Sequence, residues 1–252
     1  MACVWFVPLL FFAIAFVFSM LGMGGSQLYI PILFWVGLDL KTEAIPLGML
    51  LNVVNSATAA ATYGRRRLIA WRTAVPLAVI MLALAPVGAW MNVRVPESLL
   101  LMLFSLFTLV AATLMLSGWK PSHQHLTPVV QTSIRLSGGG AIGFLAGLIG
   151  RGGGSLAVPL LFMSGMEAKA AAATSAFVVS CAGISSFTSH IATAAQPEWA
   201  LWIVSAACVF IGSQLGSRVM ADKLRPRVMR RVFGGVLLAV AALILIKDVL
   251  LA

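Results

Sequence analysis

The residues of this sequence best suited to chemistry lie in one short run, Gly-Arg-Gly-Gly-Gly-Ser, inside an apolar stretch. A glycine weakens a helix by about 1 kcal/mol relative to alanine, so Gly152, Gly153 and Gly154 together should break the helix. A helix that restarts at Ser155 exposes unpaired backbone N–H groups and the positive end of its dipole. With the positive charge of Arg151 beside them, these groups predict a site for a small anion.

A second run of the same kind lies 128 residues earlier and contains Gly24, Gly25, Ser26 and Gln27. At this offset, 11 of the 31 positions from 15 to 45 are identical to their counterparts. Chance would give roughly one identity in twelve positions for such a composition. The chain is therefore built from two copies of one unit, and each copy carries a glycine break.

The composition is that of a protein embedded in a membrane. Hydrophobic residues make up 61% of the chain and charged residues 10%, whereas about a quarter of residues are charged in a soluble domain. The mean hydropathy of +1.03 and the repeated long apolar runs predict several transmembrane helices in a lipid bilayer. We attribute the net charge of +10 to cytoplasmic loops, and do not expect nucleic acid as a partner.

No grouping of residues in the sequence indicates an enzyme. The chain has no P-loop, no His-Glu-x-x-His pair and no Ser/His/Asp grouping. Cys3, Cys181 and Cys208 are scattered through apolar runs without the spacing of metal ligands. The sequence therefore predicts a protein that is not an enzyme and that uses neither a metal nor a cofactor.

The expected fold class is an all-α polytopic membrane protein with two inverted-topology repeats. Each repeat combines a short helix pair, broken by glycines, with three transmembrane helices. The first membrane repeat covers 1–118, a polar linker 119–135, and the second membrane repeat 136–252. The predicted helices are 4–21, 27–38, 44–62, 73–92 and 97–117, followed by 136–149, 155–166, 169–191, 198–218 and 231–250.

The opposite orientation of the two repeats is predicted from the charges of their loops. The loop from Arg65 to Arg67 should be cytoplasmic, yet its counterpart at 191–200 contains no lysine or arginine. Conversely, the loop around Arg94 is weakly charged, whereas its counterpart at 218–231 contains six basic residues. Equivalent loops with opposite charge bias indicate an inverted repeat, which we expect in the cell (inner) membrane.

Two arrangements of the glycine-broken helix pairs satisfy such a repeat, because each half must cross the membrane an odd number of times. Either both short helices cross, or they form a re-entrant hairpin with the glycines at its tip. The pieces around the second break are short for a hydrocarbon core of about 30 Å, which favours the hairpin. The longer segment 4–21 favours full crossing. Both arrangements place the two termini outside.

Polar residues on the third helix of each repeat are further candidates for contacting the anion. Asn52, Thr174 and Ser175 lie closest along the chain to the glycine breaks, and their amide and hydroxyl groups can donate hydrogen bonds while staying neutral. The alternative role is hydrogen bonding between helices, worth about 0.6 kcal/mol for each bond. No carboxylate falls near the middle of a predicted helix, which favours an anionic substrate over a cation. His190 is expected at the membrane interface, with coupling to protons as the alternative.

The segment 143–161, which spans the second glycine break, resembles the TauE/SafE family of membrane transporters, the sulfite exporter family. The Ala-Ala-Thr-Ser segment 172–175 is similar to the segment that follows in that family, and 199–216 is similar to its next helix. The resemblance implies export of a small sulfur oxyanion or an organosulfonate, such as sulfite or sulfoacetate. The first break departs from the second, since Met23 stands where the second has Arg151.

The sequence as a whole predicts a secondary transporter, or permease, for a small anion. The alternative is a membrane scaffold or assembly protein that transports nothing and whose glycines only let helices pack closely. A homodimer is compatible with the sequence. The candidate substrate-binding residues are Gly24, Gly25, Ser26, Gln27, Asn52, Arg151, Gly152, Gly153, Gly154, Ser155, Thr174 and Ser175.

Overall fold

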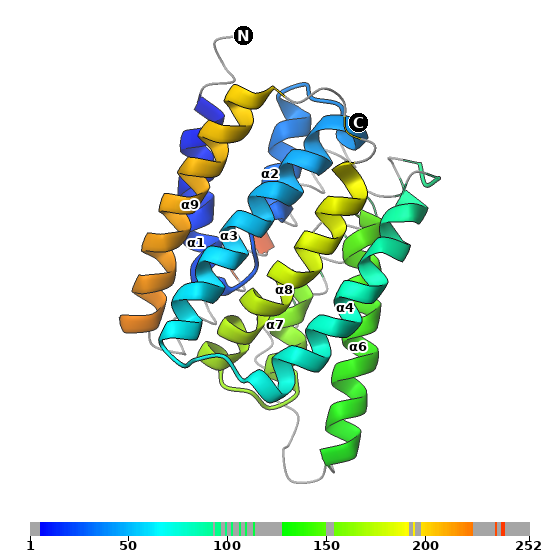
Figure 1. The fold of residues 1–252 in the computed structure, drawn as a ribbon, viewed down its shortest axis with the longest axis vertical. Helices are drawn as coiled ribbons and strands as arrows, with labels where there is room; N and C mark the ends of the chain where they lie inside the picture. The colour runs from blue at the N-terminus through cyan, green and yellow to red at the C-terminus, as the bar shows by residue number, and fades with distance from the viewer. Residues whose placement is uncertain are drawn as a thin grey trace.

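The described part of the chain folds into helices, with no strand (Figure 1). The computed structural model describes residues 6–92, 94–96, 128–149, 154–191, 194 and 198–223, and positions 99, 102, 106, 109, 113, 235, 238 and 239. Its helices are α1 (Val7–Leu21), α2 (Ser26–Trp35), the π-helix η2 (Leu40–Ala44), α3 (Ile45–Arg65), α4 (Trp71–Asn92), α6 (Pro128–Ile149), α7 (Gly154–Met163), α8 (Ala168–His190) and α9 (Trp199–Asp222).

Four helical segments among the described residues are long and apolar enough to cross a membrane. They are Leu40–Arg65, Trp71–Asn92, Ala168–His190 and Trp199–Asp222. Two shorter apolar helices accompany them, α1 and the part of α6 at Leu136–Leu148. The expectation of an all-α protein with several candidate transmembrane helices is confirmed.

One predicted boundary is wrong by about two turns of helix. α6 begins at Pro128 rather than at 136, and so takes up part of the predicted polar linker. Proline suits the first turn of a helix, because its missing N–H would have no partner there. The predicted helices at 97–117 and 231–250 lie outside the continuously described residues.

The first glycine run breaks the helix as predicted. Gly22 ends α1 with a φ of 71°, and its N–H donates to the carbonyl oxygen of Ser19 at 3.1 Å. Gly24 and Gly25 follow with φ values of 85° and 91°, after which α2 begins at Ser26. Residues with a side chain pay roughly 1–2 kcal/mol to adopt this left-handed region, so glycine is needed at these turns.

The π-helix η2, which joins α2 to α3, was not expected from the sequence. The Asp39 carboxylate caps it by accepting hydrogen bonds from the backbone N–H of Thr42 at 2.8 Å and of Lys41 at 3.1 Å. These bonds, chiefly those from Thr42, hold the pKa of the Asp39 carboxyl below its ordinary value. A lowered carboxyl pKa means that the cap stabilises the fold at neutral pH and is lost as the pH falls through that pKa.

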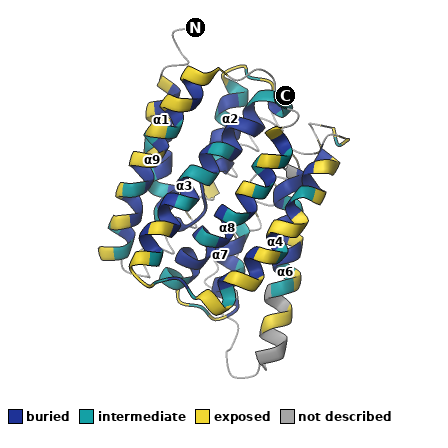
Figure 2. Ribbon diagram, viewed as in Figure 1, coloured by how far each residue is buried: buried dark blue, intermediate teal, exposed yellow. Residues whose placement is uncertain are grey.

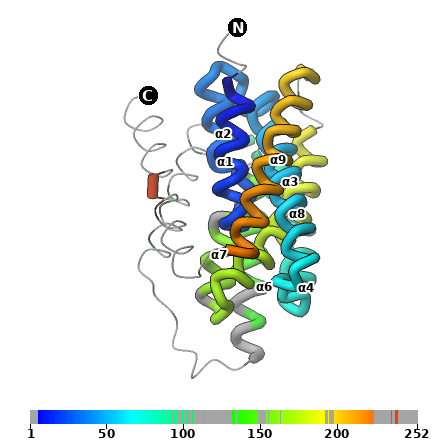
Figure 3. The backbone as a smooth tube through the Cα atoms, turned by 90° about the vertical axis from the view of Figure 1, so that its left-hand side faces the viewer, coloured from blue at the N-terminus to red at the C-terminus, as the bar shows by residue number. Residues whose placement is uncertain are grey.

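Helices of the two halves run in opposite directions (Figures 1 and 3). α1 descends to the middle of the molecule from the end where the N-terminus lies, and α2 returns to that end. α3 then runs down the full length, and α4 runs back. In the second half α6 and α8 ascend, whereas α7 and α9 descend. Each helix therefore runs antiparallel to its counterpart in the repeat.

Contacts between the two halves are reciprocal. α1 packs along α9, and its counterpart α6 packs along α4. α3 and α8 pack on each other in the centre, where Figure 2 shows them largely buried. α4 and α9 lie outside this pair and expose large apolar side chains such as Val79, Trp90 and Phe210, as helices that border lipid do.

Two glycines that are counterparts in the repeat make the same close contact. A Cβ on Gly216 of α9 would overlap the carbonyl oxygen of Phe16 on α1. A Cβ on Gly88 of α4 would likewise overlap the carbonyl oxygen of Phe144 on α6. Phe16 and Phe144 are themselves counterparts in the repeat. The absence of a side chain at both glycines lets each helix pair approach this closely.

The Gly216→Ala variant is expected to lower the melting temperature of the purified protein in detergent. Its new methyl group must displace the backbone of α1, and overpacking of this kind costs about 1–3 kcal/mol. Gly64→Ala in α3 is the matched control, because the nearest atom to its Cβ is Ile69 Cδ1 at 3.7 Å. This control should gain about 0.5–1 kcal/mol from helix propensity. Equal melting temperatures for the two variants would contradict the contact.

Candidate substrate site

The two glycine breaks meet in the interior of the molecule. Gly154 begins α7, and a Cβ placed on it would lie 2.6 Å from the carbonyl carbon of Met23 in the first break. Gly22 lies equally tightly against the backbone of Ala172 on α8. Segments about 130 residues apart in the chain are therefore in van der Waals contact, with no room for a side chain between them.

Side chains from α3 and α8 hold the first break in place. Asn55 Nδ2 donates a hydrogen bond to the carbonyl oxygen of Gly24 at 2.6 Å and another to the hydroxyl of Tyr29 at 3.3 Å. Ser175 Oγ donates to the carbonyl oxygen of Gly22 at 3.0 Å. The two bonded carbonyls belong to the irregular backbone between α1 and α2, so these side chains satisfy acceptors that no helix pairs.

Asn52 is a fully buried amide without a partner. Neither its Oδ1 nor its Nδ2 forms a hydrogen bond with any described residue, and the side chain is inaccessible to solvent. The amide lies between two glycines: a Cβ on Gly24 would overlap Oδ1, and a Cβ on Gly183 of α8 would lie 3.1 Å from Nδ2. Leaving a buried polar group unpaired costs about 1–3 kcal/mol. A ligand at the glycine breaks could remove this cost by bonding the amide.

The first turn of α2 supplies backbone donors. Ser26 and Gln27 are its first two residues and are both buried. No described residue accepts a hydrogen bond from their backbone N–H groups. Free N–H groups and the positive end of the helix dipole are the features by which helix N-termini bind anions. Gln27 Oε1 is also without a hydrogen bond to any described residue.

Other predicted site residues have different neighbours. Thr174 is buried on α8, and its Oγ1 accepts a hydrogen bond from the N–H of Ala70 at 3.1 Å. Since Ala70 directly precedes α4, this hydroxyl anchors the loop between α3 and α4. Those that lie outside the described residues are Arg151, Gly152, Gly153 and the side chain of Ser155.

Comparison with known proteins identifies the family to which this arrangement belongs. The family model of the sulfite exporter TauE/SafE matches residues 7–244. The chain belongs to this family. The TauE/SafE family consists of membrane transporters and not of enzymes, so this protein is a multi-pass membrane transporter.

Relatives of this TauE/SafE protein occur in bacteria and archaea. A "Probable membrane transporter protein" of Xylella fastidiosa strain Temecula1 is 27% identical over 240 residues, which cover 90% of this chain and 89% of the relative. A protein with the same description from Methanocaldococcus jannaschii is 24% identical over 246 residues, again covering 90% and 89%. No solved structure matches the chain significantly.

Sequence reasoning missed two residues that shape the site of this TauE/SafE protein. Asn55 bonds the first break, and Gly183 makes room for the amide of Asn52. Asn55 and Gly183 are counterparts at the offset of 128, and Asn55 shares a helix face with Asn52. The repeat and the three-residue spacing together could have pointed to both.

His190 ends α8 as expected, but its ring is buried rather than exposed at the membrane interface. The residue is 2% exposed, and Nε2 lies 3.3 Å from the carbonyl oxygen of Gly147 on α6. Packing of α8 between α4 and α6 causes this burial. Among the described residues of this TauE/SafE protein, no group of three His, Cys, Asp or Glu side chains could hold a metal ion.

Proposed function

We propose that this protein is a secondary transporter that exports a small anion, sulfite or an organosulfonate, across the cytoplasmic membrane. The observation that carries the proposal is the unpaired amide of Asn52 beside the glycine breaks. In a membrane protein an unpaired buried polar group is especially costly, because lipid offers it no hydrogen bond. The family description of sulfite exporter supports a sulfur oxyanion as the ligand.

The proposed substrate site is neutral in its described part. The amide of Asn52 and the N–H groups of Ser26 and Gln27 can donate hydrogen bonds to an oxyanion, and the sequence adds Arg151 beside the second break. Neutral donors hold an anion less strongly than a full set of charges would, which suits a carrier that must also release it. Thr174 and Ser175 keep the surrounding backbone in position.

Two inverted repeats with re-entrant helix pairs form the membrane arrangement in this proposal, with the repeats at 1–118 and 136–252. The opposite directions of counterpart helices support it. So does the length of α2 and α7, since 10 residues of helix span about 15 Å and a bilayer core is about 30 Å thick. With the loop at 65–67 cytoplasmic, α3 and α9 both end on the cytoplasmic side.

Alternating access follows from this arrangement. α3 and α8 pack on each other at the centre, and each also packs on the fourth helix of the other half. A rocking motion of one half against the other would open the breaks to one side of the membrane at a time. The small residues of α8, among them Ala172, Ala173 and Ala176, are fully buried in this contact region and offer a smooth surface for such motion.

The distribution of carboxylates supports an anionic substrate. Every acidic residue in the described part of the chain lies at a helix end or in a loop. A carrier for cations would be expected to hold a carboxylate at membrane depth. The described acidic residues are Asp39, Glu43, Glu167, Glu198 and Asp222.

Flux through the full-length protein in proteoliposomes tests the proposal. Vesicles loaded with sulfite, sulfoacetate, sulfate or phosphate should release sulfite or sulfoacetate faster than protein-free vesicles, and the Arg151→Ala variant should release them more slowly than the wild type. The four anions have similar charge, so a selective rate points to a shaped site rather than to a leak. Absence of flux for all four anions would refute the proposal.

A non-transporting scaffold is the second candidate, and the close glycine contacts of Gly88 and Gly216 favour it. In a scaffold the glycines serve helix packing alone, and the amide of Asn52 has no function. The two candidates therefore differ on Asn52: a scaffold should tolerate its replacement by an apolar residue of similar size, whereas a transporter should not.

A further inference from the structure

A second polar feature lies away from the glycine breaks, where α3 and α9 end. It is a cavity of about 430 Å³ lined by Thr62, Arg65, Arg66, Gln214, Arg218 and Asp222. We call it the arginine pocket. Its lining combines three guanidinium groups with a single carboxylate, so it carries an excess of positive charge. Residues from both halves of the chain build it.

One of the three guanidinium groups is neutralised within the pocket. Arg66 Nη2 lies 3.0 Å from Asp222 Oδ2, and this ion pair ties the end of α3 to the end of α9. Arg65 and Arg218 form no hydrogen bond or ion pair with any described residue, and both are exposed. Guanidinium groups bind oxyanions through two parallel hydrogen bonds, so two such groups are free for a ligand.

A row of polar contacts leads from the arginine pocket toward the glycine breaks. At the pocket wall, Ser217 Oγ donates to Thr62 Oγ1 at 3.2 Å. One turn deeper, Ser213 Oγ donates to the carbonyl oxygen of Asn55 at 2.7 Å. The Asn55 amide in turn bonds the carbonyl oxygen of Gly24 at 2.6 Å. The seam between α3 and α9 is thus lined with hydroxyl and amide groups from the pocket to the first break.

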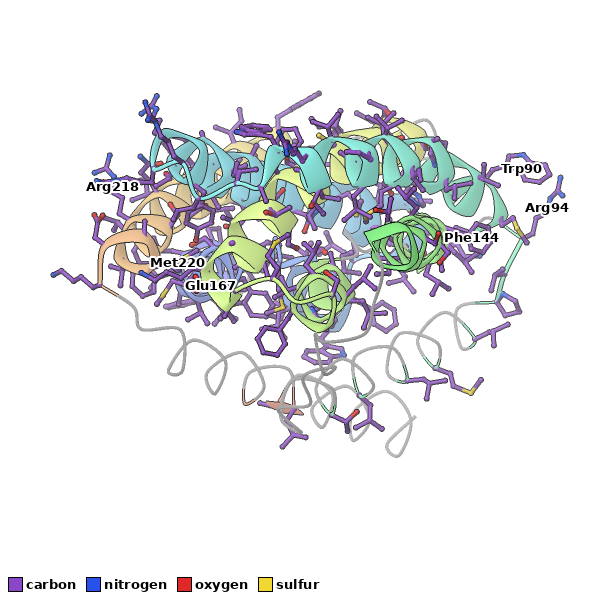
Figure 4. All side chains as sticks on the ribbon, turned by 90° about the horizontal axis from the view of Figure 1, so that it is seen from below. Trp90, Arg94, Phe144, Glu167, Arg218 and Met220 are labelled. Atoms are coloured by element: carbon purple, nitrogen blue, oxygen red, sulfur yellow. The ribbon has the colours of Figure 1, made fainter. Side chains whose placement is uncertain are left out.

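The opposite end of the repeat lacks these features. Under the offset of 128, the seam between α4 and α8 is the counterpart of the seam between α3 and α9. Trp90, the counterpart of Arg218, lies on the far side of the molecule from it, with Arg94 stacked over its ring at 4.0 Å (Figure 4). The replaced pairs are Arg65/Thr193, Arg218/Trp90, Gln214/Pro86, Ser213/Ala85 and Ser217/Ala89.

We propose that the arginine pocket is an oxyanion-binding entrance on the cytoplasmic side, from which the anion passes along the seam between α3 and α9 to the glycine breaks. This inference rests on the proposed transport of an anion. The pocket concentrates oxyanions at one mouth by charge, and the neutral central site then receives them. Having such a mouth at one end only makes the protein an asymmetric carrier whose loading side is the cytoplasm.

Binding of inorganic sulfite to the detergent-solubilised full chain tests the pocket without relying on transport. The Asn52→Leu variant removes the central amide but leaves the arginine pocket intact, so it should keep a weak, salt-sensitive binding step. Adding Arg65→Gln and Arg218→Gln to that variant should abolish this step. If the triple variant binds sulfite as the Asn52→Leu variant does, the pocket is not an oxyanion site.

Sulfite flux in proteoliposomes tests the role of the pocket as an entrance. The double variant Arg65→Gln/Arg218→Gln should lower kcat/KM about tenfold, as expected for loss of electrostatic steering, while kcat at saturating sulfite is retained. The Arg65→Lys/Arg218→Lys variant keeps the charge and the membrane topology but loses the paired hydrogen bonds, and should fall between the two. Arg67→Gln is the matched control, because it removes the same charge from the same loop outside the pocket.

Each outcome separates the pocket from its rivals. An equal loss of kcat/KM in Arg67→Gln and the double variant would mean that general surface charge acts, and would overturn the proposal. A headgroup site for anionic lipid would make wild-type flux depend on phosphatidylglycerol and would remove the effect of the double variant in pure phosphatidylcholine vesicles. Wild-type protein that binds sulfite in the pocket but moves none would refute the proposed transport and leave the pocket standing.

Discussion

The Gly154→Ala variant is expected to lose anion flux, to about one hundredth of the wild-type rate or less. Its Cβ would overlap the main chain of Met23, and a backbone segment cannot rotate away as a side chain can. The two breaks would have to separate, and displacements of about 1 Å at a working site cost on the order of a hundredfold. Flux of sulfite in proteoliposomes measures the effect.

A companion variant, Gly24→Ala, tests the same site with less risk to the fold. The new methyl group meets the side-chain oxygen of Asn52, which can shift, and the residue must also hold a φ of 85°. Gly37→Ala is the matched control, because Gly37 has a φ of 101° but nothing within 4 Å of its Cβ. The control isolates backbone strain of about 1–2 kcal/mol from the loss of the contact. A folded Gly24→Ala protein with wild-type flux would place the substrate elsewhere.

The Asn52→Leu variant should separate stability from transport. Leucine has a similar size, and its introduction removes two buried polar atoms that have no described partner, so the melting temperature should stay the same or rise. Sulfite flux should fall at least about tenfold, because the central hydrogen-bonding group is gone. A measurement of both quantities on one preparation decides the matter, since a purely structural amide would leave flux unchanged.

Asn55→Leu, one turn along the same helix face, is the matched control for this prediction. Its Nδ2 donates to the carbonyl oxygen of Gly24, so the substitution leaves a buried acceptor unpaired. We expect a loss of about 1–3 kcal/mol in the free energy of unfolding. If Asn52→Leu destabilises the protein as much as Asn55→Leu does, the amide of Asn52 has a structural partner and the interpretation of the site is wrong.

The location of the first helix break and of most helices could be predicted because local properties decide them. Glycines at 22, 24 and 25 end one helix and let another begin, and apolar runs of sufficient length form the long helices. The repeat was also readable from spacing alone. The start of α6 at Pro128 was missed because the preceding segment is polar, and polarity was taken to indicate a linker.

The roles of the polar residues depended on contacts that are distant in the chain. Asn52, Thr174 and Ser175 had equal standing in the sequence, yet Thr174 bonds Ala70 and Ser175 bonds Gly22, whereas Asn52 has no described partner. Which face of a helix meets which neighbour depends on its rotation and on segments a hundred or more residues away. No local pattern reports that.

By itself, the sequence determined that this is an all-α membrane protein made of two related halves, each with a glycine break, and it pointed to the TauE/SafE family. These properties follow from hydrophobic length, helix propensity and internal identity, which are all local or periodic. Only the tertiary structure decided that Gly154 lies against Met23, that Asn52 is the unpaired amide beside them, and that arginines of α3 and α9 share one cavity. The reason is that burial and hydrogen bonding are set by packing between the halves.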